Sequence, residues 1–396
     1  MVRLISTLAL VIFSSLVLGA EKPSATRSLM ILEAAPTMMR AIPNAQVVSQ
    51  DGDSAIIRVS DKDVESFSKW VHDNLGGCGG FLDVTEEVNE GRTLKELLQT
   101  KPKQRSTITP PTSPSKNVSQ LVAKVDKEKL WNFLAELSAF PDRSASTENG
   151  VKAANFLKDR GSKTGANLPG LSAELIETGT SYKQPSVLIT YPGKDPSLPG
   201  VVIGGHLDTY SDNKPGADDD GSGSSIVMEA LRTISASDAR FQRTIHFAWY
   251  AAEERGLVGS KYVVKHFETN AIPVHAAIQF DMVGWNSPED SEDVYLVTDY
   301  TDENLNRSLK GVIQEYTKAR VGETRCGYPC SDHANWHRAG VPVVFPFESS
   351  FSNMNHKLHT SDDKQVHLDK DHMGQFAQIA IAFLGEVAEL VSLRAN

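Results

Sequence analysis

The sequence predicts an α/β protein: a three-layer sandwich whose mainly parallel, mixed central sheet is flanked by helices, with a small α/β unit N-terminal to it. Short apolar segments typical of buried strands alternate along the chain with longer amphipathic segments typical of helices. This alternation favours a largely parallel sheet covered on both faces. The 396 residues, 40% of them hydrophobic, suffice for a large core and, by length, for roughly two to three units.

The first twenty residues (1–20) are typical of a secretory signal peptide. Arg3 supplies a short basic start, residues 4–18 are apolar, and Gly19 and Ala20 are small residues suited to cleavage. The apolar stretch is too short for a membrane span, and no other stretch approaches about 18 continuous apolar residues. We therefore expect a secreted protein without membrane association after signal removal, in a compartment that permits disulfides.

Residues 21–105 are expected to form the small α/β unit. A strand at 55–60 is followed by a helix from Asp61 to about residue 74, whose apolar side chains recur at helical spacing: Val64, Phe67, Trp70 and Val71. Residues 106–117 are rich in Pro, Ser and Thr, as in exposed, protease-sensitive linkers. This order suggests a propeptide, acting as an intramolecular inhibitor or a folding aid, that is cleaved off in the linker. A permanent accessory domain is the alternative.

The main domain is expected at residues 118–396. It begins with a helix capped by Asp126 and a second helix at 148–160. The pattern then predicts strands at 186–191, 201–205, 244–251, 276–280, 294–298 and 341–346, and helices at 222–235, 259–267, 302–317 and 372–393.

Charge and cysteine content narrow the function classes. The formal net charge of −10 makes a nucleic-acid partner unfavourable. Cys326 and Cys330 lie four residues apart, and in an exported protein this favours a disulfide, with zinc ligation by the two thiols as the alternative. Cys78 stands alone in a glycine-rich turn, and its role is open.

Residues 201–223, VVIGGHLDTYSDNKPGADDDGSG, contain the most informative pattern. A buried strand ends in His206, and a short loop leads to Asp218, Asp219 and Asp220 before a helix begins. Imidazole and carboxylate groups together suit zinc. Three consecutive aspartates repel one another unless a cation lies among them. The pattern therefore indicates a metal site, with a solvated acidic loop as the alternative.

Two further strands end in carboxylates. The strand at 244–251 precedes Glu253 and Glu254, and the strand at 276–280 precedes Asp281. Ligands of open α/β sheets bind outside the carboxyl ends of the strands, so we expect these side chains to converge. Together with a histidine from a late loop they match a pair of divalent ions, with one carboxylate bridging and one glutamate left as a base. The candidate metal ligands are His206, Asp218, one of the two glutamates Glu253 and Glu254, Asp281 and His359.

Six motifs resemble, in order and spacing, those of the secreted bacterial leucyl aminopeptidases, a family of di-zinc, co-catalytic metalloaminopeptidases. They are GGHLD, PGADDDGSG, AAEERGLVGS, QFDMVGW, CGYPCSDHANWH and PFESSF…HT, and the resemblance covers nearly all of residues 118–396. The resemblance implies a zinc-dependent enzyme with two Zn²⁺ per chain. It would remove N-terminal residues from peptides with a free N-terminus, preferring leucine and other large apolar side chains. One zinc would be held by His206 and Asp281, the other by Glu254 and His359, with Asp218 bridging.

The resemblance also assigns roles around the metals. Glu253 would be the general base and Tyr328 would hydrogen-bond the tetrahedral intermediate. Asp208 would orient His206, Asp219 and Ser331 would support the ligands, and the Asp218–Asp219 peptide bond would be cis. The apolar substrate pocket would be lined, beside the disulfide, by Met282, Phe345, Phe347, Phe351, Met354 and Leu358. We expect a monomer.

Other functions fit parts of the same pattern. A zinc carboxypeptidase would need a basic group to receive the terminal carboxylate of the substrate. A glutaminyl cyclase would use the same fold with one zinc. A binding module without activity is disfavoured by the complete ligand set and the free base. Two zinc ions per chain would separate the aminopeptidase from the last two.

Overall fold

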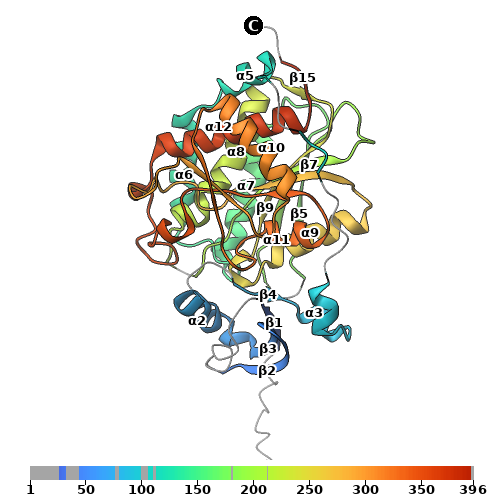
Figure 1. Cartoon of the computed structure of the whole chain (residues 1–396), viewed down its shortest axis with the longest axis vertical. Coiled ribbons are helices and arrows are strands. Elements are labelled where there is room, and N and C mark those ends of the chain that lie inside the picture. Colours follow the sequence, from blue (N-terminus) through green and yellow to red (C-terminus); the bar gives the residue numbers. More distant parts are fainter. Residues whose placement is uncertain are drawn as a thin grey trace, which may run out of the picture.

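Six strands form the central sheet of the larger, C-terminal part of the molecule, in the order β13-β10-β7-β9-β6-β5 (Figure 1). The first four run parallel, and β6 and β5 pair antiparallel. The predicted mixed, mainly parallel sheet is therefore confirmed. In sheet order the strands are β13 (Val343–Val344), β10 (Val274–Gln279), β7 (Gly200–His206), β9 (Ile245–Tyr250), β6 (Ser186–Tyr191) and β5 (Ser172–Ile176).

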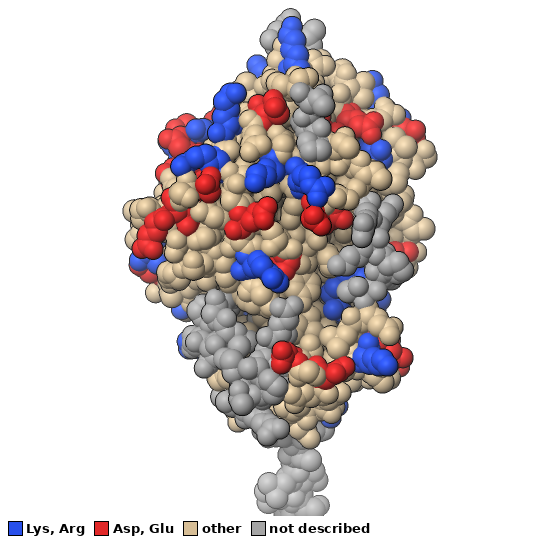
Figure 2. All heavy atoms as spheres, viewed as in Figure 1, with Lys and Arg blue, Asp and Glu red and all other residues tan. Residues whose placement is uncertain are grey.

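The computed structural model describes residues 26–32, 44–75, 80–99, 106–109, 113–179, 182–211 and 213–393. The predicted signal peptide (1–20) and Cys78 lie outside these residues. None of the helices in the described ranges combines the length and apolar character that crossing a bilayer requires. The face in Figure 2 shows basic side chains interspersed with acidic ones.

Helices cover both faces of the central sheet, as the sandwich prediction requires. Alternate strand residues point to opposite faces, so that Val201 and Ile203 belong to one apolar core and Val202 to another. The second core includes Phe267 of α9 and Trp336 of α11. Six helices pack into the first core: α5 (Lys116–Val122), α6 (Lys127–Ser138), α7 (Glu148–Thr164), α8 (Gly223–Ala236), α10 (Glu303–Tyr316) and α12 (Lys370–Val387). The other face carries α9 (Val258–Thr269) and α11 (His333–Arg338).

Capping residues account for several helix starts. The side chain of Asp126 accepts a hydrogen bond from the Lys129 N–H (3.1 Å) at the start of α6, and Asp302 accepts one from the Leu305 N–H (2.8 Å) at the start of α10. The predicted C-terminal helix was too long. It ends at Val387, because the following residues form β15 (Leu390–Ser392) and pair with β8 (Arg240–Phe241).

The strand predicted at 341–346 divides between two sheets. Its first part is β13 of the central sheet, and its end contributes to β14 (Pro346–Phe347). The second strand pairs with β11 (Val294–Val297), which also pairs with β12 (Val321–Thr324). This small sheet carries the segments that border the candidate site.

The N-terminal unit is a four-stranded sheet with helices, drawn in blue and cyan in Figure 1. Its strands, in the order β2-β3-β1-β4, are β2 (Gln46–Asp51), β3 (Ser54–Ser60), β1 (Thr26–Ile31) and β4 (Leu82–Asp83). The predicted strand at 55–60 is thus confirmed, and the other three were not predicted. A 3₁₀ turn (Asp61–Asp63) leads into α2 (Val64–Leu75), whose Val64, Phe67 and Val71 pack on the sheet. Two short helices follow, α3 (Thr85–Asn89) and α4 (Leu94–Leu98).

This unit docks on α9 and α11 of the larger domain. The Asp83 N–H donates to the Gly256 carbonyl (3.0 Å), Lys261 Nζ donates to the Asp83 carbonyl (2.8 Å), and the Arg338 guanidinium donates to the Leu97 carbonyl (2.9 Å). Leu257 and Ala334 complete an apolar cluster with residues of the unit, including Met30, Leu82 and Leu94. The N-terminal unit therefore shares a core with the larger domain.

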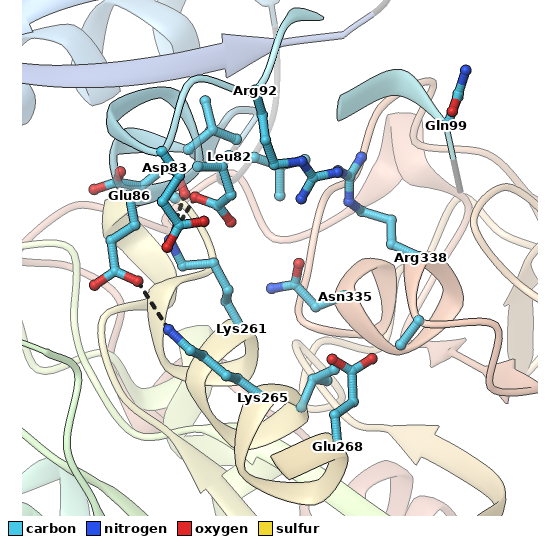
Figure 3. A pocket seen from close by; sticks show the side chains of 16 residues that line it. Leu82, Asp83, Glu86, Arg92, Gln99, Lys261, Lys265, Glu268, Asn335 and Arg338 are labelled. Carbon is cyan, nitrogen blue, oxygen red and sulfur yellow. Dashed lines mark hydrogen bonds and ion pairs between the residues drawn. The ribbon is translucent and has the colours of Figure 1, made fainter. Parts of the chain in front are cut away.

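A cavity of about 340 Å³ lies between the two parts (Figure 3). Arg92 and Arg338 extend toward each other from its two sides, and Lys265 pairs with Glu86 across it (3.3 Å). None of the predicted metal ligands lines this cavity. It belongs to the interface between the parts and is separate from the candidate site.

The predicted linker is partly anchored. Ser106 is buried, its N–H donates to Asp302 (3.4 Å), and the Ile108 carbonyl accepts from the Ser308 hydroxyl (2.5 Å). These bonds lay residues 106–109 against the start of α10. Residues 110–112 lie outside the described ranges.

Candidate metal centre and active site

The candidate site lies where three neighbouring parallel strands end. His206 is the last residue of β7, Glu253 and Glu254 follow β9 in a 3₁₀ turn (η3, Glu253–Arg255), and Asp281 follows β10. His359 comes from the loop after a second 3₁₀ turn (η4, Phe351–Asn353). The carboxyl ends of parallel strands meet at one sheet edge, which explains why residues so far apart in sequence converge. The side chains are buried, with 5% exposure at most.

A single carboxylate joins the two histidines. Asp219 Oδ1 lies 3.0 Å from His206 Nε2, and Asp219 Oδ2 lies 3.1 Å from His359 Nε2. Asp281 Oδ1 lies 3.6 Å from His206 Nε2, and Glu254 Oε2 lies 2.9 Å from His359 Nε2. The geometry therefore consists of two His–carboxylate pairs with one carboxylate shared between them.

The shared residue is Asp219, not the predicted Asp218. The carboxylate of Asp218 instead accepts hydrogen bonds from Asn355 Nδ2 (2.8 Å) and the Gly284 N–H (3.0 Å). The cis peptide bond also falls one residue later than predicted, between Asp219 and Asp220. Because the three aspartates are chemically identical neighbours, only the backbone path through this turn (η2, Ala217–Ser222) decides which one faces the histidines.

The third aspartate of the triplet holds the turn to the sheet. Asp220 Oδ2 accepts the His206 N–H (2.8 Å), and Asp220 Oδ1 accepts the Gly223 N–H at the start of α8 (2.7 Å). A ligand atom of Asp220 is also close to those of His206 and Asp281, so it lies at the edge of the same group. Its two backbone contacts assign it a structural role beside the ligands.

Asp208 connects the histidine strand to the glutamates. Its Oδ1 lies 3.4 Å from His206 Nδ1 and accepts the Glu253 N–H (3.0 Å), and its Oδ2 accepts the Glu254 N–H (3.3 Å). The predicted contact between Asp208 and His206 is present. The two hydrogen bonds from the η3 backbone to Asp208 were not predicted. They fix the backbone positions from which the Glu253 and Glu254 side chains extend.

Glu253 is the least engaged carboxylate of the group. Both of its oxygens are buried without a hydrogen-bond partner among the described residues. Burial raises the pKa of Glu253 well above its usual range, the charge on His206 opposes the rise, and Asp332 and Glu254 reinforce it. A carboxylate with a raised pKa and no partner is suited to accepting and returning a proton.

The pKa values of the buried side chains show that the carboxylates of the site favour a positive charge among them. Burial raises the pKa of Glu254 to about 7. Burial lowers the pKa of His359, but Glu254 and Asp219 outweigh it and raise the pKa to about 10. The carboxylates around the imidazole therefore stabilise a positive charge at this position. The two imidazoles and the oxygens of Asp219, Glu254 and Asp281 form a donor set that suits divalent cations.

Comparison with known proteins agrees with this geometry. Residues 186–384 match the model of peptidase family M28. A probable leucine aminopeptidase of Trichophyton verrucosum is 31% identical over 366 residues, covering 89% of this chain and 97% of that protein. This chain belongs to peptidase family M28. The crystal structure of the LapA aminopeptidase of Legionella pneumophila is 35% identical, with a TM-score of 0.83 over 93% of this chain and all of that chain.

The similarity to LapA extends beyond the catalytic domain. Coverage of 93% of this M28 peptidase reaches into the N-terminal unit, which is therefore part of the shared fold. A glutaminyl cyclase of Bacteroides thetaiotaomicron is 16% identical, with a TM-score of 0.56 over 67% of this chain and 98% of that chain. At this identity the similarity shows the fold alone.

Beside the metal centre of the M28 domain lies an apolar cluster. It unites all six residues predicted for the substrate pocket with Tyr328, Val297 and Cys330: Met282, Phe345, Phe347, Phe351, Met354 and Leu358. The predicted disulfide between Cys326 and Cys330 is confirmed. A hollow of about 570 Å³ adjoins the cluster, with Phe351, Met354 and Leu358 in its wall. Ser331 contacts Gln279 (3.3 Å), not one of the ligands, in a buried position behind the site.

The sequence did not indicate that Tyr210 contacts the candidate site. Its ring stacks on the His359 imidazole, with centroids 4.3 Å apart and an interplanar angle of 18°. Its hydroxyl donates to the Glu65 carbonyl of α2 (3.1 Å), and the Ser68 hydroxyl of α2 donates to the Glu254 carbonyl (3.4 Å). Nothing in the sequence pattern around Tyr210 indicates these contacts, because they form between parts distant in the chain.

The N-terminal unit therefore contacts residues that adjoin the candidate site. Helix α2 contacts Tyr210, whose ring stacks on His359, and the backbone of η3 at Glu254. Gly80 of the same unit approaches the Tyr328 ring, such that a Cβ added there would lie 3.9 Å from it. The unit thus borders both the surroundings of His359 and the apolar cluster.

Proposed function

We propose that this M28 peptidase is a di-zinc aminopeptidase that removes N-terminal residues from peptides and prefers leucine and other large apolar side chains. The observation that carries the proposal is the Asp219 carboxylate, which lies between His206 and His359. Glu253 is nearby, and its oxygens have no hydrogen-bond partner among the described residues. The names of its relatives, leucine aminopeptidases and an aminopeptidase, support the same reaction.

The residues present fit two cations. His206 and Asp281 would hold one, Glu254 and His359 the other, and Asp219 would contribute one oxygen to each. When bound, such a pair lowers the pKa of a water and polarises the scissile carbonyl. Zinc is proposed because two imidazoles with carboxylates suit it.

Side chains of the site would carry out the proton transfer and stabilise the oxyanion. Glu253 takes a proton from the attacking water and returns it to the leaving amine as the carbon–nitrogen bond breaks. Burial raises its pKa above that of an exposed glutamate, which makes it a stronger proton acceptor. Tyr328, a member of the apolar cluster, would donate a hydrogen bond to the developing oxyanion.

Burial of the motif arginine favours an aminopeptidase over a carboxypeptidase, which needs an accessible basic group for the terminal carboxylate of its substrate. Arg255 donates to the Tyr210 carbonyl (2.8 Å), lies over the Tyr210 ring and is 4% exposed. The apolar cluster then receives the first side chain. Discrimination by such a pocket is typically about 1–3 kcal/mol per methylene, so the preference should be broad.

We also propose that the protein is exported and that the N-terminal unit is a propeptide that blocks the site until cleavage. The start of the sequence supports export. The contacts of α2 with Tyr210 and with the Glu254 carbonyl support a regulatory role, because they tie the unit to residues that adjoin the proposed metal ligands.

The test of the reaction is hydrolysis of leucine p-nitroanilide beside its N-acetylated form, before and after chelation. We expect cleavage of the free-amine substrate alone, loss with chelator, and recovery with zinc. Cyclisation of an N-terminal glutamine peptide without hydrolysis would favour a glutaminyl cyclase, and cleavage from the carboxyl end would favour a carboxypeptidase.

The test of the propeptide uses a full-length chain with a specific protease site at residues 110–112. We expect the rate of leucine p-nitroanilide hydrolysis to rise at least about tenfold on cleavage, because cleavage lets the N-terminal unit leave. Equal rates before and after cleavage and removal of the unit would favour a permanent accessory domain.

A further inference from the structure

Two charged side chains outside the recognised motifs form hydrogen bonds with residues 215–219, the turn that carries Asp219. Arg143 lies between α6 and α7, and Asp363 lies four residues after His359. Both are buried, with exposures of 0% and 1%. We propose that Arg143 and Asp363 are positioning residues that hold residues 215–219 so that the Asp219 carboxylate faces both metal positions. This inference rests on the proposed metal centre.

Arg143 binds the turn from the carbonyl side. Its Nη1 donates to the Pro215 carbonyl (2.6 Å), its Nη2 donates to the Gly216 carbonyl (2.7 Å), and its Nε donates to the Leu207 carbonyl (2.9 Å). Its own N–H donates to Thr209 Oγ1 (3.1 Å). The guanidinium therefore ties the residue after the His206 strand to the residues before the aspartate triplet.

Asp363 binds the same turn from the N–H side. Its Oδ1 accepts the Asp218 N–H (2.9 Å), its Oδ2 accepts the Asp219 N–H (3.1 Å), and its carbonyl accepts the Ala217 N–H (3.3 Å). Asp363 stands on the loop that carries His359. The contact thus fixes the shared carboxylate relative to one of the two histidines that it joins.

The chemistry explains why these residue types are needed. Only a planar guanidinium offers several donors in fixed directions, whereas a lysine ammonium is a compact point charge. A carboxylate has two oxygens that can each accept a hydrogen bond from an N–H group. Asparagine replaces one of these oxygens by an NH₂ donor, which cannot accept a hydrogen bond from an N–H. The turn packs closely against Arg143. Gly216 has φ +54°, and a Cβ added there would lie 3.0 Å from Arg143 Nη2.

The two residues also balance charge. Arg143 is a permanent cation buried near Asp363, Asp220, Asp208 and Asp219, and their fields oppose the effect of burial on its pKa. A buried carboxylate is costly unless it is paired or hydrogen-bonded. The N–H groups of Asp218 and Asp219 meet this need for Asp363, and Arg143 places a positive charge near a turn that carries three aspartates.

The experiment compares Asp363→Asn, Arg143→Met and the milder Arg143→Lys with two matched controls. Asp362→Asn changes the neighbouring exposed carboxylate, which pairs with Lys357 (2.8 Å). Arg160→Met changes a half-buried arginine remote from the site. Metal affinity is measured by competition with a chromophoric chelator, and the absorption spectrum of the Co²⁺-loaded protein reports the coordination geometry.

We expect the metal dissociation constant to rise by about 10–100-fold in Asp363→Asn and Arg143→Met. The Co²⁺ bands should change with it, Arg143→Lys should fall between, and both controls should match the parent. A role in folding alone would lower the melting temperature but leave the affinity and the Co²⁺ spectrum of the folded variants unchanged, and that result would overturn the inference. Failure of the parent itself to bind metal would refute the proposed function instead.

Discussion

Replacing Glu253 by glutamine separates the proposed base from the metal ligands beside it. The substitution keeps the side-chain volume, and it breaks no hydrogen bond among the described residues, because both oxygens of Glu253 are without a partner there. The Glu253 N–H still donates to Asp208 (3.0 Å). A positioned general base typically contributes about 10²–10⁴-fold, which is about 3–5 kcal/mol of activation free energy. We therefore expect kcat for leucine p-nitroanilide to fall at least about 10²-fold, with KM nearly unchanged.

The assay joins steady-state kinetics with metal analysis of the same samples. Glu253→Gln should retain the metal content of the parent, whereas the matched control Glu254→Gln should lose metal, because Glu254 Oε2 lies 2.9 Å from His359 Nε2. After chelation, Glu253→Gln should melt above the parent at pH 8. The pKa of Glu253 is raised in the folded state, so the ionised carboxylate destabilises the fold above its ordinary pKa. A kcat within about tenfold of the parent, with metal bound, would refute the role of base.

Further predictions address the shared carboxylate, the stability of the metal-free protein, the oxyanion donor and the pocket. Asp219→Asn should lose both metals and Asp218→Asn should retain them, as measured by metal content after dialysis. The melting temperature of the chelated protein should fall as pH rises from about 4.5 to about 7, because the pKa of Glu254 is raised to about 7 and its proton is bound more tightly in the folded state. The metal-loaded protein should not show this fall. Tyr328→Phe should lower kcat about 10–10³-fold with metal retained. Phe351→Ala should reduce the preference for leucine over alanine p-nitroanilide by about 1–3 kcal/mol in kcat/KM.

The larger domain could be predicted because its pattern is local. β6 has the predicted bounds, 186–191, since a short apolar run between turn residues admits few alternatives. The strand split between β13 and β14 and the short strand β15 could not be foreseen, because their pairing depends on partners remote in sequence. In the N-terminal unit, β1 is buried through contact with the larger domain as well as its own sheet, which hides the alternation of a one-sided strand.

The candidate site likewise contains residues that the sequence predicts and residues that it does not. His206, Glu253, Glu254 and Asp281 follow strand ends, so the topology alone predicts that they converge. The choice of Asp219 over Asp218 depends on the backbone path of one turn, which sequence spacing cannot resolve. The residues that fix that path, Arg143 and Asp363, and the Tyr210 ring on His359, act through contacts between distant segments and leave no motif.

The central claim is a two-metal aminopeptidase site built around Asp219. Its most direct test is a zinc titration of the chelated, linker-cleaved protein, with leucine p-nitroanilide hydrolysis and bound metal measured in parallel. We expect activity to reach its plateau at two equivalents of zinc and the N-acetylated substrate never to be cleaved. Full activity at one equivalent, or activity that does not depend on zinc, would contradict it.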